Sequence, residues 1–362
     1  MSIYLLNCLM TGILGVTIEH NNCKRRLNNI LLFLIILIMW SAIYAFRGEN
    51  VGSDTSGYMY FYNQIGKTSL SLGEYLSNKG DILFEILRYM CYKISGGNWV
   101  FFSFVTAVIT YFPFLYTIKK ENSNHITMIL LLYIFFMIYY SGFNATRQAI
   151  AVSISFFSYI CYFSKKKYIK YFIIMSIAYG FHSTSIFIIP FHFLSKLSIK
   201  SKLLWIIIGL LLISTVAFST VWNTIISLFS MIGNETLANR YIENSYGGSG
   251  FFRILVIIFP IILGIWKYKI FKNRNISIDN YLILSIFCAV FMVYSTNNWL
   301  FARLSSYFSP FLILFIPKLI FIFKKDSQQL AIFMICILYF LYMIILLLHG
   351  EANLYPYNFI YN

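Results

Sequence analysis

The sequence predicts an all-α polytopic membrane protein with about twelve transmembrane segments, two of which form a short hairpin. Of its 362 residues, 59% are hydrophobic and 11% are charged, whereas about a quarter of the residues in a soluble domain are charged. The net charge of +16 comes from basic residues in short clusters between apolar runs, a placement typical of membrane anchoring rather than of nucleic-acid binding. The six cysteines form neither a CxxC pair nor a Cys/His metal spacing, so we expect no disulfide framework and no structural zinc.

Apolar runs mark the crossings, because a helix of roughly twenty residues spans the ~30 Å hydrocarbon layer. One stretch of 28 residues, 168–195, is harder to interpret because it carries Gly180-Phe181-His182-Ser183-Thr184 in its middle. We interpret it as a hairpin whose legs are 168–181 and 184–195, with His182 at the outer turn. Ten other runs are unambiguous: 2–18, 30–46, 99–118, 125–141, 146–163, 203–229, 251–271, 280–296, 300–323 and 328–348.

Six basic clusters, from Lys24-Arg25-Arg26 to Lys324-Lys325, orient these segments, because Lys and Arg gather on the cytoplasmic side. All six face the cytoplasm only if the amino terminus lies outside and 168–195 crosses twice. A single crossing there would move ten basic residues outside. Splitting 203–229 at Ser214-Thr215 instead would misplace only three lysines, so this alternative stays open.

We expect a single integral membrane domain over 1–362, interrupted by two outward loops, 47–98 and 230–250. The first loop begins with a Gly- and Ser-rich stretch that is loop-forming by composition. Later in it, apolar residues recur at helical spacing from Leu83 to Ile94, with Asp81, Glu85, Arg88 and Lys93 between them. This pattern predicts a helix that lies in the outer membrane interface.

The outward side differs from the inward side in its type of basic residue. Under this topology 16 of the 19 inward bases are Lys, whereas six of the nine outward ones are Arg. Arginine offers a planar fork that binds carboxylate or phosphate through two hydrogen bonds. The outward side is therefore expected to hold an anion, and its arginines are Arg47, Arg88, Arg147, Arg240, Arg253 and Arg303.

Arg147 is the strongest candidate, because Asn144-Ala145-Thr146-Arg147-Gln148 is predicted to open an outward helix with Asn144 as its N-cap. The unpaired amides and the helix dipole would help Arg147 to attract a phosphate. The alternative is that Arg147 reaches only to lipid headgroups. Arg303 has a similar setting after Asn297-Asn298-Trp299, and Arg253 and Arg240 flank the second loop.

Two residues, His182 and Asp54, are the candidate proton acceptors. Imidazole transfers protons near neutral pH, although His182 could instead cap its turn. Asp54 lies in the loop Gly52-Ser53-Asp54-Thr55 close to Arg47, and the alternative there is an Asx-turn. The sequence leaves the choice between the two open.

Other catalytic motifs are missing from the sequence. It has no HExxH, GxSxG, GxGxxG or paired-carboxylate spacing of the metal-binding kind. Ile65-Gly66-Lys67-Thr68 imitates the end of a P-loop, but Phe61 stands where the first glycine belongs. We therefore predict chemistry that uses no metal, no nucleotide and no cofactor.

Taken together, the outward residues resemble the EpsG family, Wzy-like polymerases of bacterial exopolysaccharide, capsule and O-antigen. The resemblance covers about 45–320. The residues that carry it are Arg47-Gly48, Gly52-Ser53-Asp54-Thr55 with Tyr58, Asn144-x-x-Arg147-Gln148, the lysines 165–167 and Phe181-His182-Ser183-Thr184.

The resemblance implies a membrane glycosyltransferase of GT-C-like architecture in the bacterial plasma membrane, with its active site facing outside. A polysaccharide chain on undecaprenyl diphosphate would be moved to a sugar hydroxyl of the next lipid-linked repeat unit. The outward arginines would hold the diphosphate, and His182 or Asp54 would accept the hydroxyl proton. The implied partners are lipid-linked oligosaccharides and membrane lipids, with a functional link to a flippase and a chain-length regulator and none to nucleic acid.

Two other functions stay open at this point. A flippase for lipid-linked oligosaccharides also needs an anion site among helices, but it would place its arginines in a central cavity between related halves. A membrane acyltransferase would also use a histidine, but it would have to draw its acyl donor from inside.

Overall fold

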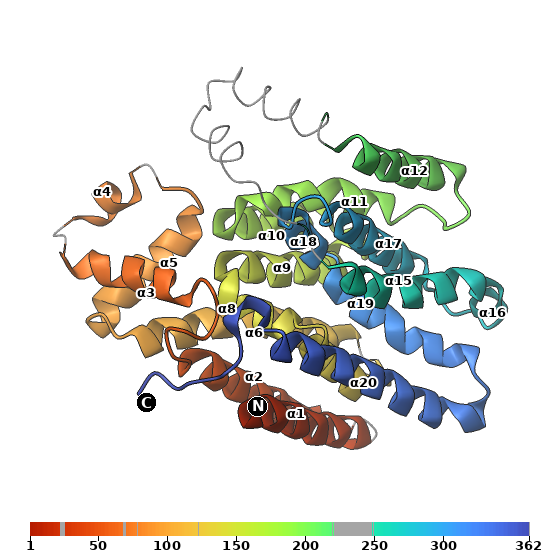
Figure 1. Ribbon diagram of the computed structural model, residues 1–362, viewed down its shortest axis with the longest axis horizontal. Helices are drawn as coiled ribbons and strands as arrows, with labels where there is room; N and C mark the ends of the chain where they lie inside the picture. The colour runs from red at the N-terminus through yellow and green to blue at the C-terminus, as the bar shows by residue number, and fades with distance from the viewer. Residues whose placement is uncertain are drawn as a thin grey trace. The chain divides into compact units, whose positions relative to one another are not determined.

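The computed structural model describes residues 1–21, 26–67, 70–77, 79–121, 123–218, 220, 248 and 250–361 (Figure 1). Within these ranges the chain is helical and forms no β-strand, so the all-helical class predicted from sequence is confirmed. The chain separates into two compact units. The first combines Met1–Ile189 with Lys324–Asn362, and the second is Pro190–Phe323. Arg240 and almost all of the predicted loop 230–250 lie outside the described residues.

The long helices of the first unit follow the predicted apolar runs. Helix α6 packs against α2 and α9, helix α7 packs against α1 and α20, and helix α10 packs against α9 and α5. The bounds are α1 Ser2–Asn21, α2 Arg26–Ala45, α6 Trp99–Glu121, α7 Ile126–Phe135, α8 Ile138–Asn144, α9 Thr146–Ser158, a π-helical turn Tyr159–Phe163, α10 Tyr168–Phe181, the 3-10 helix η3 Ser183–Ile188 and α20 Lys325–Leu348.

The first outward loop folds into its own group of short helices beside α6 and α10 (Figure 1). They are α3 Thr55–Gln64, the 3-10 turn η1 Ile65–Lys67, α4 Leu72–Leu76 and α5 Ile82–Ser95. Helix α5 is the helix predicted from the spacing of Leu83 to Ile94. It ends at Gly96, whose positive φ of 64° suits a glycine helix stop.

A buried polar network ties α4 to α5. The Tyr75 hydroxyl donates a hydrogen bond of 2.7 Å to Glu85, and Arg88 Nε donates one of 3.0 Å to the Tyr75 oxygen. Arg88 also forms an ion pair with Glu85, three residues before it on the same helix. Both charged side chains are buried, so Arg88 has a local structural partner.

The carboxyl-terminal tail folds back over the start of the first outward loop. The Gly48 N–H donates to the Asn358 carbonyl at 2.7 Å, and the Gly52 N–H donates to the Asn353 carbonyl at 3.0 Å. An isolated β-bridge joins Arg47 to Phe359. These backbone contacts hold the carboxyl-terminal tail against the start of the first outward loop.

The second unit is built around α17, which packs against α12, α15, α18 and α19. Helices α18 and α19 with η4 form a bent pair, Leu300–Ser306 and Ser309–Ile322, with an angle of 48° between them. The bounds are α11 Ile189–Leu194, α12 Lys202–Val216, α15 Phe251–Trp266, α16 Tyr268–Asn273, α17 Asp279–Tyr294, α18 Leu300–Ser306, α19 Ser309–Phe315 and η4 Ile316–Ile322.

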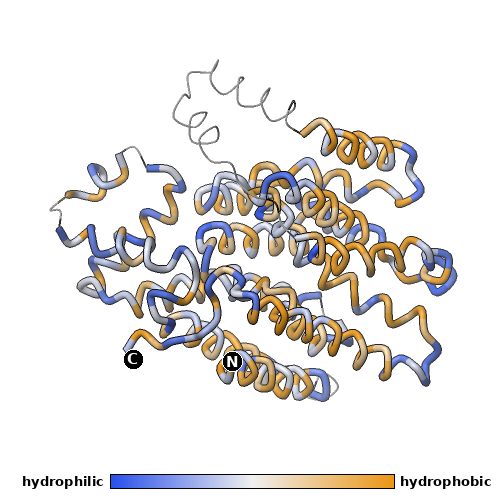
Figure 2. Tube along the Cα trace, in the orientation of Figure 1, coloured by the Kyte–Doolittle hydropathy of each residue, from blue (hydrophilic) through white to orange (hydrophobic). Residues whose placement is uncertain are grey.

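Several helices have the length and composition of membrane spans. Within the described residues, four qualify, namely Ser2–Asn21, Trp99–Glu121, Ile126–Asn144 and Lys325–Leu348, and the bent pair would be a fifth. Figure 2 shows hydrophobic colour along these helices and hydrophilic colour at their connections. Helices α1 and α20 expose large apolar side chains on their outer faces, as contact with lipid requires.

The chain is therefore a helical membrane protein. The remaining apolar helices have 10–17 residues, which is shorter than the ~20 residues of a straight crossing. Twelve crossings and a GT-C-like architecture consequently stay predictions.

Candidate functional site

An aspartate in the first outward loop, Asp81, joins three separate segments of the first unit. Its Oδ2 accepts a hydrogen bond from Arg147 Nη1 at 2.9 Å and lies 3.1 Å from His182 Nδ1. Its Oδ1 accepts the backbone N–H of Ser183 at 3.1 Å. The carboxylate therefore links the start of α5, the first turn of α9 and the break after α10. We call Asp81, Arg147 and His182 the outer cluster.

The local sequence explains how these three side chains reach one another. Asp81 precedes α5 in the left-handed conformation, with φ 52°, which aspartate tolerates better than most residues. His182 has extended backbone that separates α10 from η3, at the break predicted from the sequence. A β-carbon at Gly180 would lie 2.6 Å from Leu83 Cγ. Glycine at 180 therefore lets α10 approach α5 closely, which brings His182 to Asp81.

Charge and hydrogen bonding in the outer cluster indicate where its protons lie. Burial would raise the pKa of Asp81, but the hydrogen bond and charge of His182, the charge of Arg147 and the Ser183 amide outweigh it and lower that pKa. An ionised carboxylate only accepts hydrogen bonds. Nδ1 of His182 must therefore carry the proton, and in the neutral ring Nε2 is the nitrogen that can accept one.

The guanidinium of Arg147 has a second partner in Tyr58 on α3. Arg147 and the Tyr58 hydroxyl share a hydrogen bond. Burial raises the pKa of the Tyr58 phenol, and Arg147 offsets this only in part, so the phenol stays neutral. Although these two partners hold its position, the Arg147 side chain is 42% exposed. Since guanidinium has five N–H donors, Arg147 keeps donors for an external anion.

Asn144 has a different role from the predicted one. It is the last residue of α8, while Ala145 precedes α9, and no side chain caps α9. The reason is that Asn144 Oδ1 accepts the Ser53 backbone N–H at 2.6 Å, so the amide binds the first outward loop instead. The Ser53 hydroxyl in turn donates to Asp54 at 3.1 Å.

Arg47 is buried at the start of this loop and hydrogen-bonds to it. It is 1% exposed, its Nε donates to Thr55 Oγ1 at 3.2 Å, and its Nη1 donates to the Tyr44 carbonyl at 2.5 Å. Its guanidinium carbon lies 3.8 Å from the centre of the Tyr44 ring. Among the described residues, Arg47 forms no hydrogen bond or ion pair with Asp54, so the two do not act as a pair.

The other predicted site residues lie elsewhere. Gln148 is buried within α9. Arg303 and Arg253 belong to the second unit, where Arg303 lies over the Trp299 ring at 4.5 Å and Arg253 is half-buried in the first turn of α15. Arg240 lies outside the described residues. The structure thus brings together Arg147 and His182 from the predicted set.

Sequence reasoning missed the residue at the centre of the outer cluster. It assigns Asp81 only to the polar side of an interfacial helix and favours Asp54 as the acid. The sequence signal that could have identified Asp81 is its position after Gly80 and directly before an amphipathic helix. That signal does not say which basic groups the acid meets, because Arg147 and His182 lie 66 and 101 residues further along the chain.

Comparison with known protein families gives a match. A family model described as the EpsG family matches residues 29–359, nearly the whole chain. Neither the curated proteins nor the solved structures contain a match. The matched range includes the whole outer cluster and the tail segment that covers the first outward loop.

Proposed function

Because the chain belongs to the EpsG family, we propose that it polymerises lipid-linked oligosaccharide repeat units into a surface polysaccharide. Family membership makes it a membrane protein of polysaccharide biosynthesis. The finer assignment, glycosyl transfer from an undecaprenyl-diphosphate-linked chain at the outer face of the plasma membrane, is supported by one observation. A fixed Arg–Asp–His cluster combines an anion-binding group with an oriented base.

In the proposed reaction, the hydroxyl oxygen of the acceptor unit bonds to the anomeric carbon of the donor chain. The bond between that carbon and the diphosphate oxygen breaks, and the diphosphate leaves on its lipid carrier. The hydroxyl proton passes to His182 Nε2. General-base catalysis of this kind contributes about 10²–10⁴-fold to a rate.

Asp81 would act through His182. An ionised carboxylate at Nδ1 fixes the ring orientation and stabilises the imidazolium that forms when Nε2 takes a proton, which is the role of the acid in a Ser-His-Asp triad. Asp81 is therefore a positioning residue. Its near-complete burial, with 8% of the side chain exposed, shields this interaction from water.

Arg147 would bind the diphosphate and stabilise the charge that develops as it leaves. Donors that are held in place before the reaction are effective, because they need no reorganisation when the charge appears. Asp81 and Tyr58 hold the Arg147 guanidinium in this way, while 42% of the side chain stays exposed.

The first test is made in the cell. Deletion of the gene should abolish long surface polysaccharide while single repeat units still reach the surface. Repeat units trapped on the inner side would contradict the proposal and favour a flippase.

The second test uses purified protein with a lipid-linked single repeat unit in detergent. His182→Ala should reduce the polymerisation rate by about 10²–10⁴-fold. His20→Ala, which removes an exposed histidine at the end of α1, is the matched control and should keep the wild-type rate. A His182→Ala protein that folds and polymerises normally would remove the base from the proposal.

A further inference from the structure

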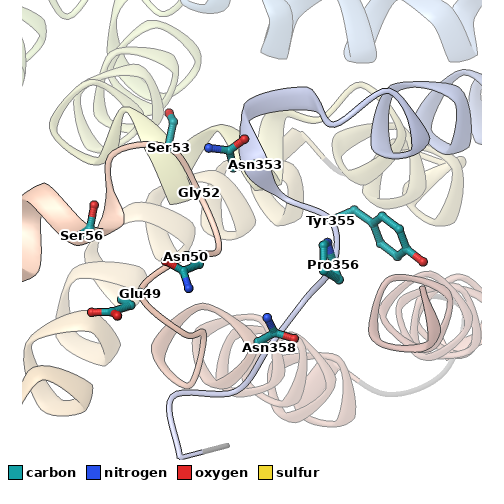
Figure 3. A pocket seen from close by; sticks show the side chains of 9 residues that line it. All are labelled: Glu49, Asn50, Gly52, Ser53, Ser56, Asn353, Tyr355, Pro356 and Asn358. Carbon is teal, nitrogen blue, oxygen red and sulfur yellow. The ribbon is translucent and has the colours of Figure 1, made fainter.

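An open polar pocket of about 360 Å³ lies between the start of the first outward loop and the carboxyl-terminal tail (Figure 3). We call it the tail pocket. Figure 3 shows the side chains of Asn50 and Asn358 between the two segments, while the Tyr355 ring points away from the loop. Its lining is Glu49, Asn50, Gly52, Ser53, Ser56, Asn353, Tyr355, Pro356 and Asn358.

Backbone hydrogen bonds build the tail pocket and leave its three asparagine amides available. The bonds from the Gly48 and Gly52 N–H groups use the carbonyls of Asn358 and Asn353, not their amide side chains. Among the described residues, no hydrogen bond engages the side-chain amides of these two residues or of Asn50. Three amide groups, each with donors and an acceptor, are therefore free to bind a ligand.

The loop side of the tail pocket has a fixed shape. Gly52 has φ +96°, and a β-carbon there would lie 2.7 Å from the Phe143 carbonyl oxygen. Only glycine fits this position without strain. Since the loop is clamped on one side by the tail and on the other by Asn144, we expect the pocket to exist before a ligand binds.

The chemistry of the lining selects the class of ligand. No Lys, Arg or His lines the tail pocket, and its one charged residue is the carboxylate of Glu49. An anion would be repelled there. A neutral sugar ring matches the lining, because each of its hydroxyls can both donate to and accept from amides, hydroxyls and a carboxylate. The volume also falls in the range of about 300–1,000 Å³ typical of small-molecule sites.

We propose that the tail pocket binds a neutral sugar ring of the repeat unit, so that the chain recognises its saccharide separately from the diphosphate. This inference rests on the proposed function. The pocket is connected to the outer cluster through the chain, since Ser53 binds Asn144, three residues before Arg147. Helix α3 carries both Ser56 of the pocket and Tyr58, which contacts Arg147. A lipid-linked saccharide could thus place its diphosphate at Arg147 and a sugar in the tail pocket.

Steady-state kinetics with the lipid-linked repeat unit tests this division. The double variant Asn50→Ala/Asn358→Ala should raise KM by at least about 10-fold, as expected for the loss of two hydrogen bonds, while kcat changes less than about 2-fold. Asn63→Ala, which removes an exposed amide on α3 outside the pocket, should leave both constants unchanged. An unchanged KM in the double variant would overturn the inference.

Direct binding separates failure of the pocket from failure of the proposed reaction. The probe is the lipid-free oligosaccharide released by mild acid from the host cell's own lipid-linked repeat units, titrated calorimetrically into purified protein. The double variant should bind it at least about 10-fold more weakly than wild type or Asn63→Ala. This holds whether or not the protein polymerises. Equal affinity in all three proteins would overturn the inference.

Salt dependence of the same titration tests the neutral character of the ligand. The dissociation constant should be the same in low and high salt, because a neutral ring has no charge for salt to screen. Binding that weakens steeply with salt would instead show that a charged group of the oligosaccharide carries the affinity, and it would contradict the inference.

Discussion

At the scale of single residues, the proposed chemistry depends on the partners of the two carboxylate oxygens of one buried acid, Asp81. Oδ2 of Asp81 meets both Arg147 and His182, and Oδ1 meets the Ser183 amide. The acid thereby balances the charge of Arg147 and also fixes the tautomer of His182. In the proposed mechanism, one carboxylate thus prepares both the anion-binding group and the base.

Arg147→Lys should strongly reduce polymerisation at unchanged protein level. Lysine keeps the positive charge but loses the planar fork that binds Asp81, Tyr58 and a phosphate at once, so we expect a fall of at least about 10-fold. Polymer yield in cells, with immunoblotting for protein level, measures it. Arg303→Lys should behave similarly if Arg303 also holds diphosphate.

Arg274→Lys is the control for this substitution, since Arg274 donates to the Phe321 carbonyl in the second unit. It should leave polymer yield unchanged. Wild-type polymer from Arg147→Lys would show that Arg147 is only a headgroup anchor.

Asp81→Asn should lower stability in a pH-dependent manner. The pKa of Asp81 is lowered in the folded chain, so its ionised form adds stability above the ordinary carboxyl pKa of about 4. That contribution is lost as the pH falls through the lowered value. We expect Asp81→Asn to cost about 1–3 kcal/mol at neutral pH, with the difference from wild type closing in acid.

Thermal unfolding in detergent, followed by intrinsic fluorescence from pH 7 down to about pH 3, measures this difference. Asp54→Asn is the control, because Asp54 makes no ion pair among the described residues. A stability gap that is constant over the whole pH range would contradict an ionised Asp81.

At the scale of elements, helix packing decides whether the outer cluster forms. Helix α10 approaches α5 at Gly180 and Leu83, and each helix carries or adjoins one member of the cluster. The positions of the helices could be predicted from sequence, because apolar runs and the break at His182 are local signals. The contacts between these helices could not be predicted, because neither segment carries a local sequence signal that identifies its packing partner.

Gly180→Ala should reduce polymerisation by about 10–100-fold, because small displacements of catalytic groups are costly. The added methyl would meet Leu83 and separate α10 from α5. Leu83→Ala, added as a second substitution, should restore much of the rate by making room for that methyl. Full activity of Gly180→Ala alone would show that the close approach is unimportant.

At the scale of the whole chain, the predicted topology is consistent with the packing of the first unit. The basic clusters predict that segments near 46–53, 81–83, 144–147, 181–183 and 352–360 all lie on one side of the membrane. Hydrogen bonds join these same segments in pairs, through Asn144 to Ser53, through Asn353 to Gly52 and through Asp81 to both Arg147 and Ser183.

The sequence could not predict the role of every outward arginine. An i, i+3 spacing from Glu85 explains why Arg88 is paired locally, and that spacing is visible in the sequence. The burial of Arg47 is not visible in the sequence, because its partners are the Tyr44 ring, the Thr55 hydroxyl and the Tyr44 backbone carbonyl. Arginine counts indicate an anion-binding side, but only the packing shows that Arg147 is partly exposed and Arg47 is buried.

Cysteine accessibility tests the topology of the chain. In intact cells an impermeant thiol reagent should label His182→Cys and Ser245→Cys but not Lys166→Cys, because 165–167 is a predicted cytoplasmic cluster. Cys23, on a predicted cytoplasmic loop, serves as the internal control and should stay unlabelled. Labelling at 166 without labelling at 182 would place the outer cluster on the wrong side for the proposed reaction.

The most direct test of the central claim is a double-mutant cycle between Asp81 and His182, measured as the polymerisation rate of purified protein on a lipid-linked repeat unit. If Asp81 acts through His182, Asp81→Asn should slow polymerisation by the otherwise wild-type protein. The same change should have almost no further effect on the His182→Ala enzyme. The double variant is then about as slow as His182→Ala alone. Rate losses of the two single variants that multiply in the double variant would contradict the proposed mechanism. Wild-type rates in the single variants would also contradict it.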